Sequence, residues 1–388
     1  MKDALLNFLI AFLILMVLSL ILFPREALEA AKSGINLWLF TITPSLLPFF
    51  IGSELLLQLG VVHFLGTFLD PIMRPIFNVP GSGSFAMAIG YTSGYPVGAQ
   101  VISRLWEENL CTTEEAERLM SFCNNSGPLF MLGAVAIGMF GSPKAGYIIM
   151  ASNYLAAITT GLLFRFYKRK AYTKQESTKN LFSSALFKMS QVRSKNDKSI
   201  STILSEAVTK SINTILLIGG YVVFFSVVIE FLKLYKILDL FSQLLFPLFS
   251  TLGFDKSTLP PFLSGFLEIT VGSNLMSQLS VPMSQKIILT SALIAWGGIS
   301  IHGQVLGVIS RTKIKYILYF IAKTMQFFLA ALYSYWLLQI IKIEEKNAIH
   351  PVFSLYTYTN SLNIFEFSTV LFLLITLILL FFAIAVKQ

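Results

Sequence analysis

The sequence predicts an all-α polytopic membrane protein with about eight transmembrane helices and two re-entrant hairpins, arranged as two inverted repeats. Of its 388 residues, 55% are hydrophobic and only 13% are charged, whereas soluble domains carry about 25% charged residues. The mean hydropathy is +0.72, the apolar residues gather in long runs, and a set of short motifs recurs at a near-constant offset. These observations exclude a soluble protein and a single-span receptor.

Apolar runs long enough to cross a bilayer core of about 30 Å as helices occur along the whole chain. The first run exceeds the core of a signal peptide, about 7 to 15 residues, and no small-residue cleavage site follows it, so we expect a retained helix. The eight runs are Leu5–Phe23, Ile35–Val62, Phe122–Phe140, Tyr147–Phe166, Ile212–Leu234, Ile287–Ile309, Ile317–Ile341 and Phe365–Val386.

Two further apolar stretches, Phe85–Leu105 and Leu259–Leu279, are interrupted by clusters of Gly, Pro, Ser and Thr. Such clusters break a helix and leave backbone groups unpaired. Unpaired backbone is tolerated at membrane depth only where it is buried in protein or lines a wet cavity. We therefore predict two re-entrant hairpins.

A basic segment sets the predicted orientation. Arg165–Lys210 contains eleven Lys and Arg residues and is otherwise rich in Ser, Thr, Asn and Gln, which is typical of a cytoplasmic loop under the positive-inside rule. Counting spans outward from it places both termini in the cytoplasm. The net charge of +9 therefore indicates topology, and we expect the lipid bilayer, not nucleic acid, as the partner.

The chain carries an internal repeat. The motifs SGYPVGAQ at Ser93–Gln100 and SGFLEITVGSN at Ser264–Asn274 both contain Ser-Gly-aromatic followed by Val-Gly. Each hairpin is followed by an interrupted helix, CNNSGP at Cys123–Pro128 and WGGISIHG at Trp296–Gly303, and the spacing from hairpin to break is the same in both copies. Three spans and one hairpin separate equivalent points, so the second copy must be inverted.

Inverted repeats with broken helices are the plan of secondary transporters, in which free helix ends hold an ion or a charged solute at the bilayer midplane. We expect five regions on this basis. They are an N-terminal transmembrane helix with an external turn (1–33), the first repeat (34–168), a basic cytoplasmic loop (169–210), the second repeat (211–341), and an external loop with a C-terminal transmembrane helix (342–388).

The second hairpin tip holds Glu268, the only carboxylate expected at either tip. An acidic side chain at the bilayer centre costs about 2.5 to 3.5 kcal/mol on insertion scales. Glu268 is either a protonated structural residue or a ligand for a coupling cation or proton, or it shares a divalent metal with a dicarboxylate solute. The other candidates at this tip are Ser264, Gly265, Thr270, Ser273 and Asn274.

The first hairpin tip allows two interpretations. Tyr95 and Pro96 fit simple turn chemistry. In the functional interpretation, backbone N–H groups near Ser93, Gly94 and Gly98 contact a carboxylate, while the Tyr95 ring stacks on a flat solute. Both interpretations can hold together.

Polar residues also interrupt the helix after each hairpin. Asn124, Asn125 and Ser126 either form interhelical hydrogen bonds or hold a solute or ion, because an unpaired amide in hydrocarbon costs a few kcal/mol. The second break contributes Ser300, His302 and Gln304, and the histidine is either a packing residue or a proton acceptor near the second tip. An acidic run is interpreted as a solvated cytoplasmic helix: Glu107, Glu108, Glu114, Glu115 and Glu117.

The hairpin SGYPVGAQ, the break CNNSGP and the basic central loop resemble the YlbJ family of sporulation integral membrane proteins, also called SpoVV, whose halves belong to the nucleoside-recognition Gate group. The resemblance covers residues 35–338. It implies a fold similar to concentrative nucleoside transporters, residence in the outer forespore membrane, and movement of dipicolinate from mother cell toward forespore. The chain lacks the Gln-Thr and Asn-Glu pairs of nucleoside transporters, which argues against a nucleoside substrate.

The expected function is therefore secondary transport of a small anionic aromatic dicarboxylate. No nucleotide-binding or hydrolase motif occurs, and Ser300 and His302, at i and i+2, face different sides of a helix, so we expect neither an enzyme nor an organic cofactor. The sequence leaves open the coupling cation or proton, the co-transport of calcium, and a homo-oligomer. The alternatives are a transporter of nucleosides or other metabolites, and a sporulation scaffold that moves no solute.

Overall fold

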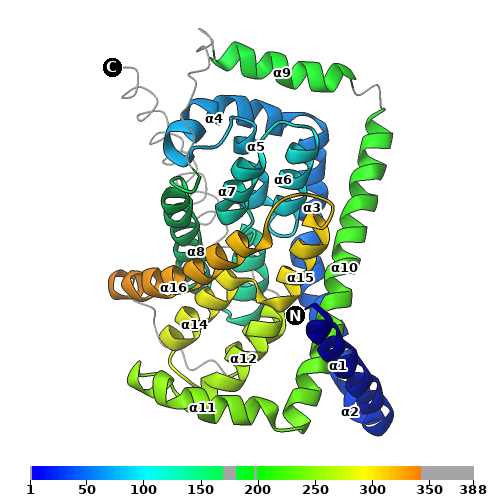
Figure 1. The fold of residues 1–388 in the computed structure, drawn as a ribbon, viewed down its shortest axis with the longest axis vertical. Coiled ribbons are helices and arrows are strands. Elements are labelled where there is room, and N and C mark those ends of the chain that lie inside the picture. Colours follow the sequence, from blue (N-terminus) through cyan, green and yellow to red (C-terminus); the bar gives the residue numbers. More distant parts are fainter. Residues whose placement is uncertain (1, 169–180, 196–198, 342–388) are drawn as a thin grey trace, which may run out of the picture.

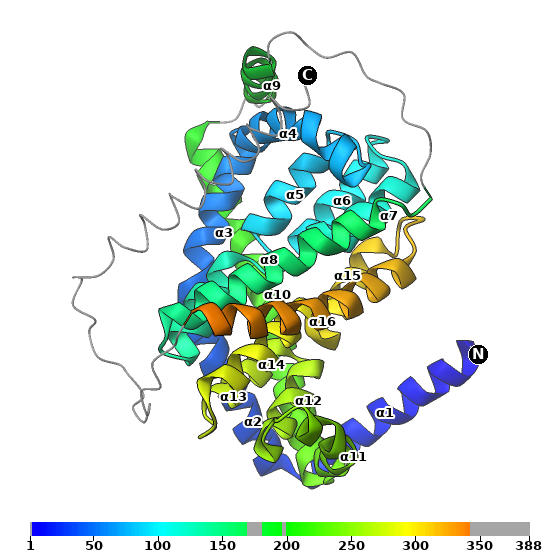
Figure 2. The same cartoon turned by 90° about the vertical axis from the view of Figure 1, so that its left-hand side faces the viewer.

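Every regular element is helical in the computed structural model of this chain, which describes residues 2–168, 181–195 and 199–341. Figure 1 shows an elongated bundle in which the long helix α10 (Ile200–Leu234) runs along one side, and Figure 2 shows α1 (Lys2–Leu22) projecting from the lower part of the bundle. The predicted all-α fold class is confirmed.

Five helical segments of the described residues are long and apolar enough to cross a membrane. Each overlaps one of the eight predicted runs. The segments are Pro24–Leu56, Pro143–Phe164, Ile200–Leu234, Met283–Ile309 and Tyr316–Ile340.

The other three predicted runs differ for separate reasons. The first coincides with α1, a helix of 21 residues in which the stretch Ile10–Leu22 counts among the shorter apolar helices. The run at 122–140 is split, because α7 (Thr113–Cys123) ends inside it and a short π-helix, η2 (Phe130–Met139), begins only after the polar break. The run at 365–386 lies outside the described residues.

The two halves of the chain contain the same elements in the same order. After α2 (Pro24–Asn36) and η1 (Leu37–Ile42), the first half comprises α3 (Thr43–Gln58), α4 (Val61–Phe77), α5 (Gly83–Thr92), α6 (Val97–Glu107), α7, η2 and α8 (Pro143–Phe164). The second half comprises α10, α11 (Ile237–Thr251), the short η3 (Lys256–Thr258), α12 (Leu259–Leu267), α13 (Ile269–Ser277), α14 (Met283–Trp296), α15 (Gly298–Ile309) and α16 (Tyr316–Ile340).

Equivalent elements of the two halves lie at opposite ends of the molecule. Helix α4 is at the upper end of both views and its counterpart α11 is at the lower end, and the α5–α6 and α12–α13 pairs follow the same pattern (Figures 1 and 2). This is the arrangement expected of inverted repeats.

The hairpin arms are too short to cross a bilayer. Helices α5, α6, α12 and α13 contain 10, 11, 9 and 9 residues. At 1.5 Å of rise per residue each arm is about 15 Å long, which is half of the hydrocarbon core. Each pair can therefore enter the membrane and return, as predicted for the two interrupted stretches.

The basic segment that was predicted as a loop at 169–210 is partly helical. Helix α9 covers Leu181–Lys195, and α10 already begins at Ile200, where Ser199 caps it by accepting a hydrogen bond from the Thr202 N–H. The end of this segment is thus the first part of a long helix.

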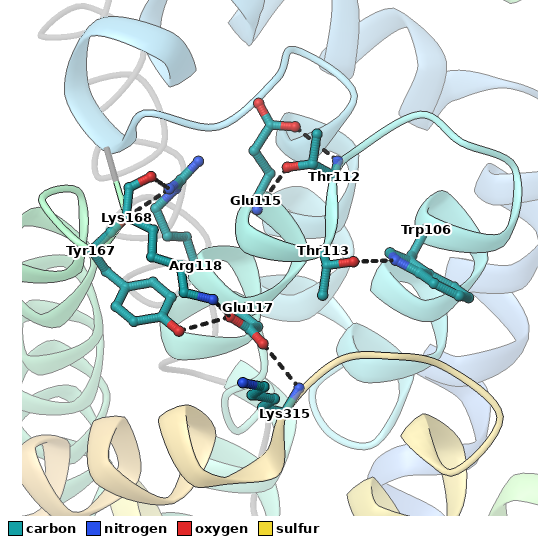
Figure 3. Close-up of polar contacts among 9 residues, drawn as sticks. All are labelled: Trp106, Thr112, Thr113, Glu115, Glu117, Arg118, Tyr167, Lys168 and Lys315. Atoms are coloured by element: carbon teal, nitrogen blue, oxygen red, sulfur yellow. Dashed lines mark hydrogen bonds and ion pairs between the residues drawn. The ribbon is translucent and has the colours of Figure 1, made fainter. Parts of the chain in front are cut away.

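The interpretation of the acidic run as fully solvated is wrong for Glu117. This side chain is only 1% exposed. Its Oε2 accepts a hydrogen bond from the Tyr167 hydroxyl at 2.9 Å, and its Oε1 accepts one from the Lys315 backbone N–H at 3.1 Å. The ammonium of Lys168 lies 3.7 Å away (Figure 3). The carboxylate therefore joins α7 to the chain after α8 and to the start of α16, that is, one half of the protein to the other.

We expect Glu117→Ala to lower the free energy of unfolding by about 2 to 4 kcal/mol, because the substitution strands buried donors that bonded a charged acceptor. The measurement is thermal unfolding of the purified protein in detergent. The matched control is Glu108→Ala, whose exposed partner is Arg104 one turn away, and whose loss should cost at most about 0.5 kcal/mol. Equal losses in the two variants would contradict the role of Glu117.

Candidate functional site

One cavity is lined by both hairpin tips and by residues of both helix breaks. Seven of the residues predicted as a binding site lie on it: Ser93, Gly94, Tyr95, Ser126, Glu268, Thr270 and Gln304. The remaining wall is mostly apolar and comes from η1, α3, the start of η2, α10 and α15, through residues that include Ile42, Phe50, Phe130, Ile218, Tyr221 and Ile301. Segments that are far apart in the sequence therefore meet at the place that the repeat predicts.

The first tip packs directly against the first break through glycine. A Cβ on Gly90 would overlap the carbonyl oxygen of Cys123, and one on Gly94, whose φ is +81°, would lie 2.6 Å from the Gly127 nitrogen. Because both neighbours are backbone atoms, no side chain can be accommodated at either position. These contacts hold the tip and the end of α7 together as one wall of the cavity.

Asn124 is a structural link in this wall. It is fully buried, its Oδ1 accepts a hydrogen bond from the Ala99 N–H at 3.2 Å, and its Nδ2 donates to the Tyr319 hydroxyl at 3.0 Å. It therefore caps the amino end of α6 and ties that end to α16. Neither Asn124 nor Gly98, which packs against the Cys123 carbonyl, lines the cavity.

Glu268 joins the two arms of the second hairpin and faces the cavity. Its Oε2 accepts a hydrogen bond from the Val271 N–H at 2.7 Å, and its Oε1 accepts one from the Thr270 hydroxyl at 3.1 Å. The carboxylate is thus the amino-terminal cap of α13, and it is only 3% exposed. Glu268 therefore has a structural role as a cap and also lines the cavity, while its binding of a cation or proton stays a prediction.

The structure places His302 outside the cavity lining. Its Nε2 lies 3.1 Å from the Trp296 carbonyl and its Nδ1 lies 2.7 Å from the Tyr316 hydroxyl. A carbonyl can only accept, so Nε2 carries the proton and Nδ1 accepts from the tyrosine in the neutral ring. Both ring nitrogens are used, which fits the packing interpretation of this histidine.

The other predicted residues of the second half lie behind the tip. Ser264 donates to the Pro260 carbonyl of its own helix, and Gly265 packs against Gly272 of the opposite arm. Ser273, Asn274 and Ser300 do not line the cavity. Among the described residues no three His, Cys, Asp or Glu side chains gather as a metal-binding group.

Three buried polar atoms on the cavity have no hydrogen-bond partner within the described part of the chain. They are the Tyr95 hydroxyl, Ser126 Oγ and Gln304 Oε1, on side chains that are 9%, 3% and 7% exposed. An unpartnered buried polar atom costs about 1 to 3 kcal/mol, and such atoms point to a bound ligand or water. Tyr95 and Ser126 belong to the first half of the protein and Gln304 to the second.

Sequence reasoning missed Lys323 and Gln326. Lys323 is 1% exposed, and its ammonium donates to Asn125 Oδ1 at 3.3 Å and to Gln326 Oε1 at 2.9 Å. Gln326 in turn donates to the Ser121 carbonyl of α7 at 2.7 Å. The available signal was a lysine in the middle of an apolar span, which marks a functional residue more often than a packing one.

The comparisons with known proteins agree with this architecture. The family described as Gate, nucleoside recognition, matches residues 39–167 and 215–313, which fall within the two predicted repeats. The sporulation integral membrane protein YlbJ of Bacillus subtilis (strain 168) is 38% identical over 327 residues, which is 83% of this chain and 80% of that protein. An uncharacterized protein of Alkalihalophilus pseudofirmus is 29% identical over 129 residues, 32% of this chain and 27% of that one.

A solved structure is also similar. CNTnw, solved as a variant in a state named intermediate 3, superposes with a TM-score of 0.44 at 13% identity, over 88% of this chain and 86% of that one. This likeness is too weak to support an argument. The family matches confirm the resemblance inferred from the sequence motifs: the chain belongs to the Gate nucleoside-recognition family and, within it, to the YlbJ family of sporulation integral membrane proteins.

Proposed function

We propose that this protein is a secondary transporter of a small anionic solute and that the cavity between the hairpin tips is its solute site. The observation that carries the proposal is that both halves contribute a tip and a residue of a helix break to one cavity. In inverted-repeat transporters such a cavity is reached alternately from each side as one part of the protein rocks against the other.

The chemistry of the cavity supports an aromatic carboxylate as the solute. The Tyr95 ring offers a flat surface for stacking. The Ser126 hydroxyl and the Gln304 amide N–H groups can donate hydrogen bonds to a carboxylate, and the apolar wall suits the edge of a ring. Dipicolinate, a pyridine with two carboxylates, combines these features, and we propose it as the substrate.

Glu268 gives this site a coupling group. A carboxylate on the cavity wall repels an anionic solute unless a proton or a cation neutralises it. We propose that Glu268 takes up that proton or cation, calcium included, when the solute binds. The gradient of that proton or cation across the membrane would then drive the movement of the solute.

The name of the relative YlbJ supports a setting in sporulation. We propose that the protein lies in the outer forespore membrane, with both termini in the mother-cell cytoplasm, and moves dipicolinate toward the forespore. The family description favours a second candidate, a nucleoside. Uptake of labelled dipicolinate and of labelled uridine into proteoliposomes separates the two: uptake of uridine without uptake of dipicolinate would reverse the ranking.

The site itself is tested by Gln304→Met, which removes the unpartnered amide at nearly constant side-chain length. We expect dipicolinate uptake to fall about tenfold, which is the equivalent of one lost hydrogen bond to a charged group, while the melting temperature stays the same or rises. The matched control is Thr290→Val. It removes another unpartnered buried oxygen at constant shape, away from the cavity, and should leave uptake at the parental rate. A parental rate in Gln304→Met would contradict the proposed site.

A further inference from the structure

Lys323 is a lysine buried in the middle of a predicted membrane span. Its side chain is 1% exposed, and within the described part of the chain it forms no ion pair within 4.0 Å. A buried ammonium without a carboxylate partner is expensive in a membrane protein. The hydrogen-bond acceptors of the Lys323 ammonium must therefore carry enough negative charge to stabilise it.

That potential comes from the carboxyl end of α7. The last carbonyls of a helix have no partner within it and carry a partial negative charge. Here the Ser121 carbonyl accepts from Gln326 Nε2, and the Phe122 carbonyl accepts from Asn125 Nδ2. Each of these amides directs its oxygen at the Lys323 ammonium. The two amide oxygens thus present the partial negative charge at the carboxyl end of α7 to the Lys323 ammonium.

Oxygen groups at the carboxyl end of a broken helix are the arrangement that coordinates a mobile cation in transporters. In this protein the Lys323 ammonium occupies the position next to these oxygen groups. We infer that Lys323 is a built-in cation: it occupies the place between Asn125 and Gln326 that a sodium ion could otherwise take, and its charge makes the neighbouring cavity select anions.

The link to the cavity passes through Tyr95. The Lys323 ammonium lies 6.0 Å from the centre of the Tyr95 ring and 5.9 Å from that of Tyr319, and the Tyr95 ring lines the cavity. The positive charge therefore lies directly behind the first tip, one ring away from the solute. This inference rests on the proposed function for its solute class, but the identity of the resident cation does not depend on it.

The parent protein provides the first test. Dipicolinate affinity is measured by thermal stabilisation of the purified protein in sodium chloride and in N-methyl-D-glucamine chloride of equal ionic strength. We expect affinities within about twofold of each other, since the positive charge is covalently fixed. The same comparison in Glu268→Gln removes any sodium effect that arises at that carboxylate. A loss of affinity greater than tenfold on removal of sodium, or a higher melting temperature of the solute-free protein in sodium, that persists in Glu268→Gln would overturn the inference.

Two substitutions provide the second test. Lys323→Met removes the charge and fills the space, whereas Lys323→Ala removes the charge and leaves a vacancy beside two amide oxygens. We expect dipicolinate affinity to fall at least tenfold in Lys323→Met. We expect sodium to raise the melting temperature of Lys323→Ala by about 3 °C and to leave that of Lys323→Met unchanged.

Lys286→Ala is the matched control. This lysine is also buried and lies within the helical segment Met283–Ile309, but its ammonium donates to the Ser277 carbonyl, away from the α7 end. It should show neither the loss of anion affinity nor the response to sodium. Parental anion affinity in Lys323→Met, or an absent sodium response in a folded Lys323→Ala, would overturn the inference.

The two failures can be told apart. If no anion stabilises the parent, the proposed function fails, and the sodium response of Lys323→Ala alone decides whether Lys323 is the resident cation. If neither lysine variant folds, the comparison of sodium with N-methyl-D-glucamine on the parent decides.

Discussion

Gly272→Ala is expected to remove most of the folded protein. A Cβ at this position would overlap the Cα and nitrogen of Gly265, and it would lie 3.0 Å from the Pro261 carbonyl oxygen. All three are backbone atoms, so no side-chain rotation can relieve the collision. Overpacking of a well-packed interior costs about 1 to 3 kcal/mol when side chains can shift, and a backbone collision exceeds that range. The two arms of the second hairpin would separate.

The measurement is the yield of monodisperse protein on size exclusion, followed by thermal unfolding of the material recovered. Gly303→Ala is the matched control, because a Cβ there meets nothing within 4 Å and the position lies inside α15. It should fold as well as the parent or better, since alanine favours a helix over glycine by about 1 kcal/mol. Similar yields from the two variants would show that the hairpin arms do not meet at these glycines.

Glu268→Gln is expected to abolish concentrative uptake, with a fall of at least about tenfold in the accumulated solute, while the protein stays folded. The fold is retained because the amide oxygen of glutamine can still accept the hydrogen bond from the Val271 N–H, so the cap of α13 persists. Transport fails because a permanently neutral amide cannot take up and release a proton and lacks the negative charge that attracts a coupling cation.

Dipicolinate accumulation in proteoliposomes, with and without an imposed ion gradient, measures this effect. Asp255→Asn is the matched control, since Asp255 is also a carboxylate cap that accepts from a backbone N–H, that of Ser257, but it is exposed and lies outside the spans. Hydrogen bonds from the Ser257 N–H and hydroxyl lower the pKa of Asp255, so this control also removes an ionised group. Parental accumulation in Glu268→Gln would exclude a coupling role for that carboxylate.

Much of the site was predictable because the relevant signals are local. The tips at Ser93–Gln100 and Ser264–Asn274 and the breaks after Cys123 and Trp296 consist of residues that stop helices, and the structure ends helices at all four places. The repeat then implied that the tips should meet. Glu268, Tyr95 and Ser126 do lie on a shared cavity.

Polar residues whose partners are distant in the sequence were the ones misjudged or missed. Lys323 was missed, and its partner Asn125 lies 198 positions away. Glu117 looked solvated within an acidic run, and its partners come from the ends of α8 and α16. Nothing in the sequence next to these residues identifies the groups that satisfy them.

The sequence by itself determined that the chain is a membrane protein with two inverted halves and where its helices stop, because hydrophobic length and helix-breaking residues act over a few neighbouring positions. Only the tertiary structure decided which charges are buried and against what. Asn125 meets Lys323, and Glu117 meets the backbone of Lys315, across 198 positions in each case. Such pairs form because one half packs against the other, and that packing is a property of the assembled helices and not of any single segment.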